Sequence, residues 1–282
     1  IGSGLVGSEM CIRDRIASDM DGTFLTANDE YSQGRFERIL DNMKARDMRF
    51  VAASGRQVKN LQELFEPTIG KGYEIDFVGS NGAMVATSQE QLYAVHLSPA
   101  QLSKVIAWNA KNPESAENII IMTGDRATYV SNHATGPVAE MVFQFYPNVK
   151  QVEKLMEVDD HILEITFVWP NDEVQQHVAE LREIFGSELH ATGSGFGSVD
   201  VLGKGVDKAA GLQVLQDYYD VLDSEVMTFG DNGNDLEMLQ KYPNSFVMPN
   251  ANSFMLTAVQ NKALNTNVND GVLETIEHFL GI

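Results

Sequence analysis

Short apolar runs that end in polar or glycine-rich residues alternate with amphipathic stretches in the first part of the chain. The apolar runs occupy residues 16–18, 50–53 and 77–79. Between them, apolar residues recur at helical spacing after Ser32 and again around Phe65. Strands that alternate with helices in this way predict a parallel α/β sheet. Ligands bind at the carboxyl ends of the strands in such sheets, so the polar residues there are the first candidates for a site.

The middle of the chain, residues 85–193, follows a different pattern and carries no obvious cluster of chemically active residues. Residues 119–122 and 162–168 are strongly apolar and predict strands, whereas 172–185 places apolar side chains on one side of a helix. The first pattern returns with the apolar run at 226–229. We therefore expect an inserted α/β domain that forms a cap or determines substrate specificity.

These patterns divide the chain into three parts. Residues 16–84 and 194–282 are expected to form the parallel-sheet core, and residues 85–193 the inserted cap. Residues 1–15 lack periodicity and resemble translated adapter sequence, so they do not enter the fold argument. The G-x-G-x-x-G spacing within them has no strand-like run before it and does not predict a dinucleotide site.

The composition is that of an ordinary globular protein, with 282 residues of which 43% are hydrophobic and 21% charged. The net charge of -20 disfavours a nucleic-acid partner, because the phosphate backbone would be repelled. No uncharged apolar run is long enough to span a membrane, and no signal peptide is evident. The single cysteine, Cys11, cannot form an internal disulfide. We expect a cytoplasmic protein without an obligate protein partner.

Two pairs of carboxylates stand at the ends of predicted strands. Asp19 and Asp21 follow the first apolar run, and Asp231 and Asp235 follow the run at 226–229. Like charges this close repel each other unless a cation lies near. Carboxylates gathered at one edge of a parallel sheet suit Mg²⁺, which prefers oxygen ligands. The alternatives are a solvated acidic turn for the first pair and capping of the following helix for the second.

Residues that suit a phosphoryl group occur near the same strand ends. Lys208 lies in the first turn of a predicted helix, where the helix dipole disfavours a cation. It is either a solvated side chain or one that points into the crevice and neutralises a phosphate. Thr23, Ser54 and Gly55 offer hydroxyl and amide donors, although such residues are also common in turns. Arg56 either joins them or is a surface charge.

Other chemistries are poorly represented in the sequence. The six histidines form no metal-ligand spacing, so a zinc site is not expected. The glycine-rich segment at 193–197 does not match the G-x-S-x-G motif of a nucleophilic serine. No G-x-x-x-x-G-K-[ST] motif is present, which argues against a P-loop kinase or NTPase.

The segments 19–23 and 54–56, Lys208 and the segment 230–235 together resemble the four motifs of haloacid dehalogenase (HAD) superfamily phosphatases. Their order, with a long insertion between the second and third motifs, resembles the Cof-like branch with a type IIB cap. That resemblance implies a Rossmann-like core with an inserted α/β cap of the C2B type. The segment 206–209 looks closest to bacterial sugar phosphatases of this branch.

The resemblance also implies a division of labour among the acidic residues. Asp19 would be the nucleophile that forms an aspartyl-phosphate. Asp21 would protonate the leaving alkoxide and then act as the base for the attacking water. Mg²⁺ would be held by the side chains of Asp19 and Asp231 and by the main-chain carbonyl of Asp21, with Asp235 assisting through water. Lys208 would stabilise charge on the transferring group.

The remaining motif residues would bind substrate. By resemblance, the phosphoryl group would be held by Thr23, Ser54, Gly55 and Lys208, and Asn234 would contact phosphate or substrate near the cap. The expected function is a Mg²⁺-dependent phosphatase of small phosphorylated metabolites, sugar phosphates first. The alternatives are a phosphatase of a nucleotide or cofactor precursor and a receiver-like signalling module. The position of Asp21 and the lid-sized insertion argue against the receiver.

Overall fold

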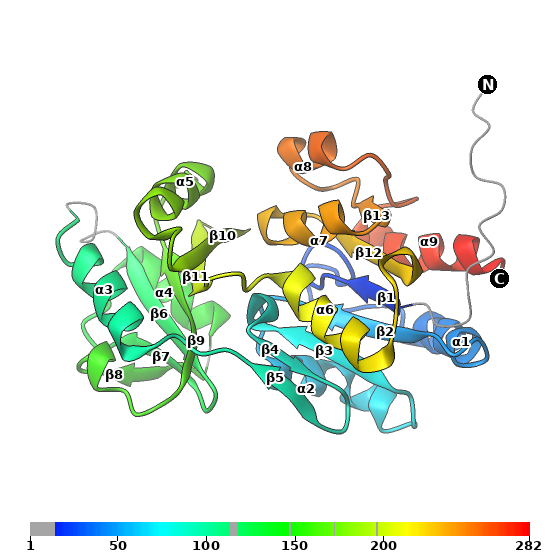
Figure 1. Ribbon diagram of the computed structural model, residues 1–282, viewed down its shortest axis with the longest axis horizontal. Helices are drawn as coiled ribbons and strands as arrows, with labels where there is room; N and C mark the ends of the chain where they lie inside the picture. Colours follow the sequence, from blue (N-terminus) through cyan, green and yellow to red (C-terminus); the bar gives the residue numbers. More distant parts are fainter. Residues whose placement is uncertain (1–14, 113–117, 147, 172, 196) are drawn as a thin grey trace.

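The computed structural model describes residues 15–112, 118–146, 148–171, 173–195 and 197–282. The adapter-like stretch, its glycine spacing and Cys11 lie outside these residues, apart from Arg15 at its end. No helix in the described part of the chain is long and apolar enough to cross a membrane. Two α/β domains lie side by side, each built on one sheet (Figure 1).

The described residues of the larger domain form a seven-stranded sheet in the order β13-β12-β1-β2-β3-β4-β5. The strands from β13 to β3 pair in parallel, as the alternation of strands and helices predicts, and β4 and β5 add an antiparallel hairpin. The strand bounds are β1 (Arg15–Ser18), β2 (Arg49–Ala53), β3 (Ile75–Gly79), β4 (Met84–Ala86), β5 (Gln91–Ala94), β12 (Val226–Gly230) and β13 (Asn244–Val247).

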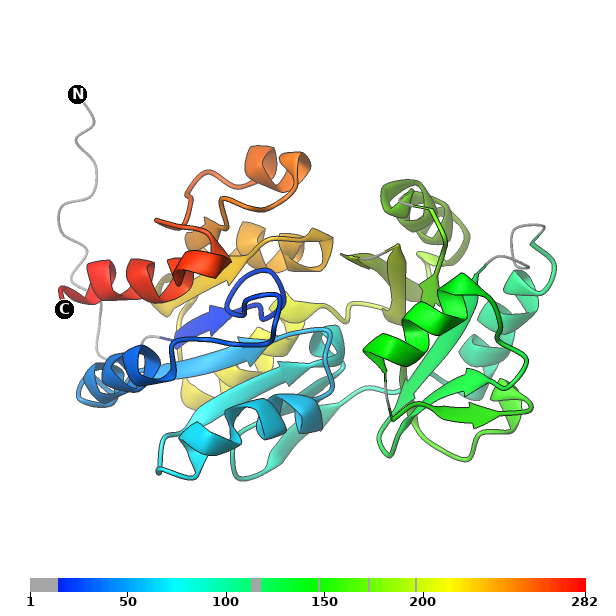
Figure 2. The ribbon, with the colours of Figure 1, turned by 180° about the vertical axis from the view of Figure 1, so that it is seen from behind.

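Helices cover both faces of this sheet (Figures 1 and 2). Strand β1 is buried throughout, with Ile16 packed beneath the helices of one face and Ala17 beneath those of the other. One face carries α1 (Gln33–Lys44), α2 (Val58–Ile69) and α9 (Gly271–Leu280), and the other α6 (Lys208–Tyr219) and α7 (Leu236–Lys241). The short helix α8 (Ser253–Ala258) packs on α7, and single 3₁₀ turns include η1 (Ser80–Gly82), η4 (Asp223–Glu225), η5 (Gly233–Asp235) and η6 (Asn267–Asn269).

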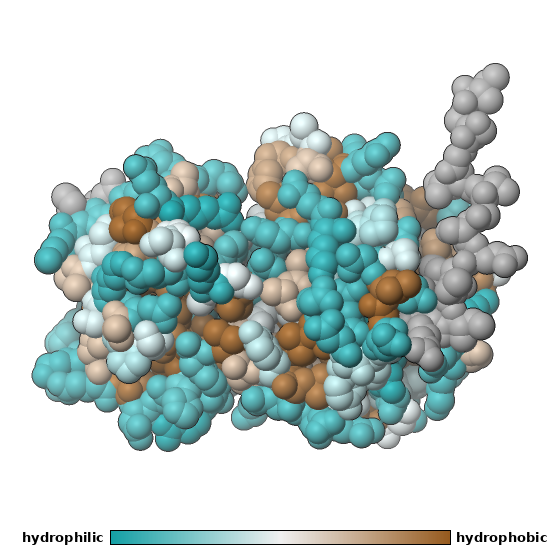
Figure 3. All heavy atoms as spheres, in the orientation of Figure 1, coloured by the Kyte–Doolittle hydropathy of each residue, from teal (hydrophilic) through white to brown (hydrophobic). Residues whose placement is uncertain are grey.

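The smaller domain, the cap, has a six-stranded sheet of described residues in the order β10-β11-β9-β6-β7-β8. Its strands are β6 (Ile119–Gly124), β7 (Thr128–Ser131), β8 (Lys150–Val152), β9 (Ile162–Val168), β10 (Leu189–Gly195) and β11 (Ser198–Gly203), with the turn η3 at Leu155–Glu157. The helices α3 (Pro99–Asn109) and α5 (Val174–Phe185) pack on one face, and α4 (Pro137–Phe145) on the other. The surface seen in Figure 3 is mostly hydrophilic over both domains.

The domain boundaries differ from those expected from the sequence, because two strands join the other sheet. Strand β5 at residues 91–94, which we assigned to the cap, pairs with β4 in the core sheet. Strand β11 at residues 198–203, which we assigned to the core, pairs with β9 and β10 in the cap sheet. The boundaries at residues 84 and 194 were therefore wrong. A short apolar run predicts a strand but not its partner, because either sheet can accept it.

The turn η1 ties the core sheet to the start of α6. Gly82 has a φ of 98°, and a Cβ there would lie 2.1 Å from the backbone oxygen of Asp207. Asp207 caps α6, since its side chain accepts a hydrogen bond from the backbone N–H of Ala210 at 2.8 Å. Lys208 is the first residue of that helix. The contact at Gly82 therefore sets where Lys208 lies.

We expect Gly82→Ala to destabilise the protein more than the matched variant Gly72→Ala. Gly72 also has a positive φ, 90°, but no atom lies within 4 Å of the position its Cβ would take. Gly72→Ala should therefore lower the free energy of unfolding by the backbone strain alone, about 1–2 kcal/mol. Gly82→Ala adds a clash with backbone and should cost about 1–3 kcal/mol more. Urea unfolding measures both values, and equal losses would contradict the packing argument.

Candidate active site

The acidic residues at the ends of β1 and β12 meet because these strands are neighbours in the sheet. The backbone N–H of Asp19 donates to the carbonyl of Phe229 at 2.9 Å, which extends the ladder between the two strands by one residue. Carboxylate oxygens of Asp19, Asp231 and Asp235 lie within 4.8 Å of one another. The structure thus brings together three of the four carboxylates that the sequence singled out.

Lys208 lies at the centre of this acid cluster. Its Nζ is 2.6 Å from Oδ1 of Asp19 and 2.7 Å from Oδ1 of Asp235, and its side chain is fully buried. Burial alone would lower the pKa of Lys208, but the two carboxylates outweigh it, and the pKa rises above its usual value. The lysine is therefore charged and points into the crevice, which excludes the solvated alternative.

The cluster carries more negative charge than Lys208 can balance. Burial, and then the charge of Asp235, raise the pKa of Asp19 well above its usual value. The same two causes raise the pKa of Asp231 to about 6. Buried carboxylates that repel each other and offer oxygen ligands fit a divalent cation such as Mg²⁺.

Asp235 has a supporting place in the cluster. Its Oδ1 is paired with Lys208, while its Oδ2 accepts the backbone N–H groups of Asp231 at 2.9 Å and Asn232 at 3.0 Å. Both oxygens are thus engaged by the protein. Asp235 therefore orients the lysine and the loop that carries Asp231.

Thr23 lies in the cluster, where its hydroxyl forms a hydrogen bond with Asp231. Its hydroxyl donates to Oδ1 of Asp231 at 2.7 Å. The preceding Gly22 has a φ of 78°, and a Cβ there would lie 2.6 Å from Oδ2 of Asp231. The loop after β1 thus wraps around the Asp231 carboxylate, and the Thr23 hydroxyl that we expected on phosphate is directed at this carboxylate.

Asp21 stands apart from the cluster. Its side chain is half exposed, and its two oxygens accept from the guanidinium of Arg56, one of them from Nε at 2.9 Å. The same guanidinium also pairs with Asp29. Arg56, whose role the sequence left open, therefore holds Asp21 at the accessible edge of the site.

Ser54, Gly55 and Asn234 surround Asn81, which follows β3. The backbone N–H of Asn81 donates to the carbonyl of Ser54 at 3.1 Å, and the backbone N–H of Arg56 donates to Oγ of Ser54 at 3.1 Å. Asn234 donates from Nδ2 to Oδ1 of Asn81 at 2.9 Å, and a Cβ on Gly55 would lie 3.4 Å from the Asn81 amide. The second and fourth motifs are thus joined through Asn81.

Two acids of the cap also reach this point, and the sequence patterns assign them no role. Asn81 donates from Nδ2 to Asp200 at 2.8 Å and to Glu164 at 3.4 Å, and both carboxylates are buried. A signal was present in the strand at 162–168, where Glu164 and Thr166 stand two residues apart among apolar side chains. Two polar residues on one face of a buried strand indicate a polar environment there.

The structure also gathers two histidines that are far apart in sequence. Nε2 of His96 lies 2.8 Å from Asp125, and Nδ1 of His161 lies 3.6 Å from the same carboxylate. Sequence spacing could not reveal this group because its members come from three separate segments. It is partly exposed and lies outside the acid cluster.

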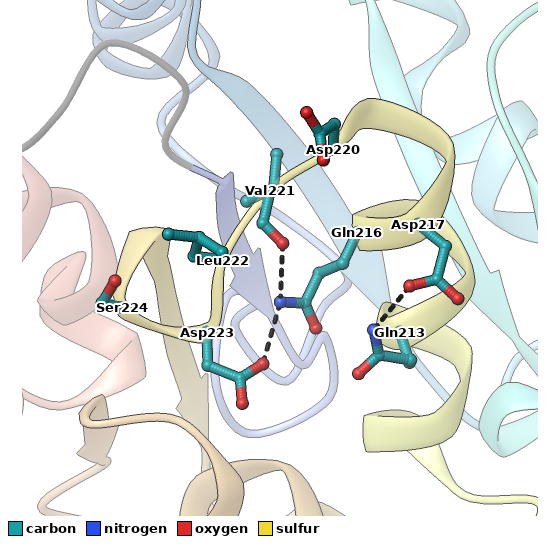
Figure 4. A pocket seen from close by; sticks show the side chains of 8 residues that line it. All are labelled: Gln213, Gln216, Asp217, Asp220, Val221, Leu222, Asp223 and Ser224. Atoms are coloured by element: carbon teal, nitrogen blue, oxygen red, sulfur yellow. Dashed lines mark hydrogen bonds between the residues drawn. The ribbon is translucent and has the colours of Figure 1, made fainter.

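A hollow at the far end of α6 is not part of the catalytic site. Figure 4 shows it beside the last turns of the helix, where Gln216 donates to the carbonyl of Val221 at 3.2 Å and to Asp223 at 2.9 Å. Lys208 begins the same helix at its other end. The hollow is lined by Gln213, Gln216, Asp217, Asp220, Val221, Leu222, Asp223 and Ser224.

The fold combines a Rossmann-like sheet, acids and a buried lysine at the carboxyl edge of that sheet, and an inserted α/β cap. Residues 16–276 match the haloacid dehalogenase-like hydrolase family, and the chain belongs to that family. The family implies a divalent metal, which the acid cluster fits.

The chain is also similar to individual proteins of known sequence or structure. It is 33% identical over 265 residues to the 5-amino-6-(5-phospho-D-ribitylamino)uracil phosphatase YbjI of Escherichia coli (strain K12), covering 94% of this chain and 95% of that protein. The crystal structure of SMU.1108c from Streptococcus mutans UA159 matches with a TM-score of 0.87 and 30% identity, over 96% of this chain and 100% of that one. The subclass IIB sugar phosphatase BT4131 matches with a TM-score of 0.76 and 19% identity, over 95% and 100%.

The chain is thus a HAD-type phosphatase, a phosphoric monoester hydrolase that acts on small phosphorylated metabolites. The α/β core with an inserted cap and the Cof-like resemblance are confirmed. At 19% identity, the sugar phosphatase supports the fold alone.

The acid cluster predicts how the stability of the metal-free protein depends on pH. An acid whose pKa is higher in the folded than in the unfolded state destabilises the fold when it ionises. The pKa of Asp231 rises from 3.8 to about 6, so the free energy of unfolding should fall between about pH 4 and somewhat above pH 6. A bound divalent cation favours ionised ligands, so added MgCl₂ should reduce this fall.

Thermal unfolding with EDTA or MgCl₂ across this pH range measures the effect. The variant Asp231→Asn removes the ionising group, and it should show a smaller fall with pH and a smaller gain from MgCl₂. A fall that is equally steep with EDTA and with MgCl₂ would contradict a cation at the cluster.

Proposed function

We propose that this chain is a Mg²⁺-dependent phosphatase of a small metabolite in which a phosphorylated polyol is joined to a pyrimidine. The observation that carries the substrate class is the 33% identity to a phosphatase of 5-amino-6-(5-phospho-D-ribitylamino)uracil along nearly the whole chain. A cofactor precursor, given above as the alternative, is thus better supported than the sugar phosphates that we expected first.

Asp19 is the proposed nucleophile. Its carboxylate is buried beside Lys208, which holds one oxygen at 2.6 Å and leaves the other for attack. Attack forms a bond between this oxygen and phosphorus and breaks the bond from phosphorus to the leaving oxygen. Water then attacks the phosphorus of the aspartyl-phosphate, which releases inorganic phosphate and restores Asp19.

Asp21 is the proposed proton carrier. It protonates the leaving alkoxide in the first step and takes a proton from water in the second. Its half-exposed position at the edge of the cluster, held by Arg56, supports this role because the leaving group must depart toward the accessible side. The proton that Asp21 gives in one step is thus recovered in the next.

The metal site is proposed to consist of the side chains of Asp19 and Asp231 and the main-chain carbonyl of Asp21, with Asp235 behind them. When bound, Mg²⁺ supplies positive charge that offsets the charge of the phosphoryl group. Asp235 keeps Lys208 and the Asp231 loop in place.

The phosphoryl group is proposed to lie against Lys208, the Ser54 hydroxyl and the backbone N–H of Gly55. Lys208 stabilises charge on the transferring oxygens. Thr23 acts through Asp231, to which it donates, and Asn234 through Asn81. These two residues therefore orient other groups of the site.

Hydrolysis should depend on Asp19 and favour the pyrimidine-linked substrate. The purified protein is assayed with and without Mg²⁺ on 5-amino-6-(5-phospho-D-ribitylamino)uracil, glucose 6-phosphate and p-nitrophenyl phosphate. We expect kcat/KM for the first to exceed that for the sugar phosphate by at least about tenfold. Asp19→Asn should lower turnover of every substrate by at least about 1,000-fold.

The control is Asp217→Asn, an exposed carboxylate near the far end of α6, which should keep wild-type turnover. Undiminished turnover in Asp19→Asn would overturn the mechanism, and a higher kcat/KM for the sugar phosphate would restore the first expectation. A long-lived phosphoprotein without turnover would instead favour a signalling switch.

Asp21→Asn should slow turnover by at least about 100-fold, because proton transfer to the leaving group is lost. The main-chain carbonyl remains, so Mg²⁺ affinity measured by calorimetry should stay close to that of the wild-type protein. A large loss of Mg²⁺ affinity would show that the Asp21 side chain serves the metal and not the proton transfer.

A further inference from the structure

A row of polar side chains crosses one face of the cap sheet. Thr123 on β6 lies opposite Glu164 on β9, and Asp200 on β11 lies opposite both Thr166 on β9 and Thr192 on β10. Residues directly opposite in antiparallel strands share a face. Helix α4 covers the apolar part of this face. The polar row occupies the same face of the sheet.

The polar row meets the core beside the proposed phosphoryl site. Asn81 donates to both Asp200 and Glu164, and its own carbonyl accepts from Asn234. The Asn81 amide also lies against the position where Gly55 would carry a Cβ. A phosphate held at Gly55 would thus lie beside the residue that contacts both cap acids.

Glu164 and Asp200 are buried, and neither forms a salt bridge within the described part of the chain. Asp200 accepts from the hydroxyl of Thr166 at 2.7 Å, from Asn81 at 2.8 Å and from Ser194. Glu164 accepts from Asn81 and from Thr123. Burial raises the pKa of both carboxylates. Two carboxylates offer about eight acceptor positions, more than these few donors fill.

A third group in the row has no protein partner. Oγ1 of Thr192 is buried and finds no hydrogen-bond partner among the residues that the structure describes. It lies directly opposite Asp200. A buried hydroxyl that lacks a partner costs stability unless a ligand or water satisfies it.

We propose that Glu164 and Asp200 bind the leaving group and select phosphomonoesters whose leaving group carries several O–H or N–H donors. Thr192 adds a hydroxyl to this subsite. The inference rests on the proposed function and names the residues that give it specificity. Buried acceptors reject a ligand that lacks donors, because the acceptors are then left unpaired.

The competing explanation is mechanical. Through Asn81, the two acids also fasten the cap to the core. If fastening were their only role, replacing them would impair all substrates equally, since cap closure serves every reaction alike. Selective loss therefore distinguishes recognition from fastening.

The test compares a donor-rich and a donor-poor leaving group. The variants Glu164→Gln and Asp200→Asn of the full chain, with Mg²⁺ present, are assayed on ribitol 5-phosphate and p-nitrophenyl phosphate. We expect the ratio of the two kcat/KM values to shift by at least about tenfold against ribitol 5-phosphate. Glu188→Gln, an exposed cap acid paired with Lys104, should leave the ratio unchanged.

Some outcomes would overturn the inference, and others separate it from the proposed function. An unchanged ratio in Glu164→Gln and Asp200→Asn, or equal loss on both substrates, would overturn recognition by the two acids. If the wild-type protein hydrolyses no phosphate ester, the proposed function fails, and calorimetry still tests the subsite. In that case ribitol 5-phosphate should bind the wild-type protein at least about tenfold more tightly than Glu164→Gln, and equal affinity would reject the subsite.

Discussion

The ammonium group of Lys208, fully buried between two carboxylates, is the interaction on which the rest of the site depends. A buried charge is tolerated only when it is paired, so the start of α6, the end of β1 and the loop after β12 must meet at one point. The close contact between Gly82 and Asp207 serves the same placement, because it fixes where α6 begins. Packing at a glycine thus determines the position of the buried lysine.

The ionised carboxylates that a metal would bind also lower the stability of the fold. Burial and mutual repulsion raise the pKa values of Asp19 and Asp231, so each of these carboxylates weakens the metal-free fold when it ionises. A bound divalent cation would reverse that balance. In the proposed function, metal binding, folding and reactivity are linked through the same few carboxylates, and Asp235 holds its neighbours in place.

The inserted cap contributes a second set of buried acids, Glu164 and Asp200, in addition to the acid cluster of the core. The core offers cations and amides to a phosphate, whereas Glu164 and Asp200 of the cap offer only acceptors. Asn81 touches both sets, in a left-handed backbone conformation with a φ of 52°. This division assigns the phosphate to the core and supports a leaving group rich in hydrogen-bond donors on the cap.

The sequence by itself determined the parallel α/β core, the inserted cap and the gathering of Asp19, Asp231 and Asp235 at one edge of the sheet. This was possible because the carboxyl ends of neighbouring parallel strands share one edge, so residues that follow strands come together there. Only the tertiary structure decided that Lys208 is buried among these acids, which sheet β5 and β11 join, and that Arg56 holds Asp21. The cap acids likewise emerged only from strand register, which apolar runs do not encode because pairing is a contact between distant segments.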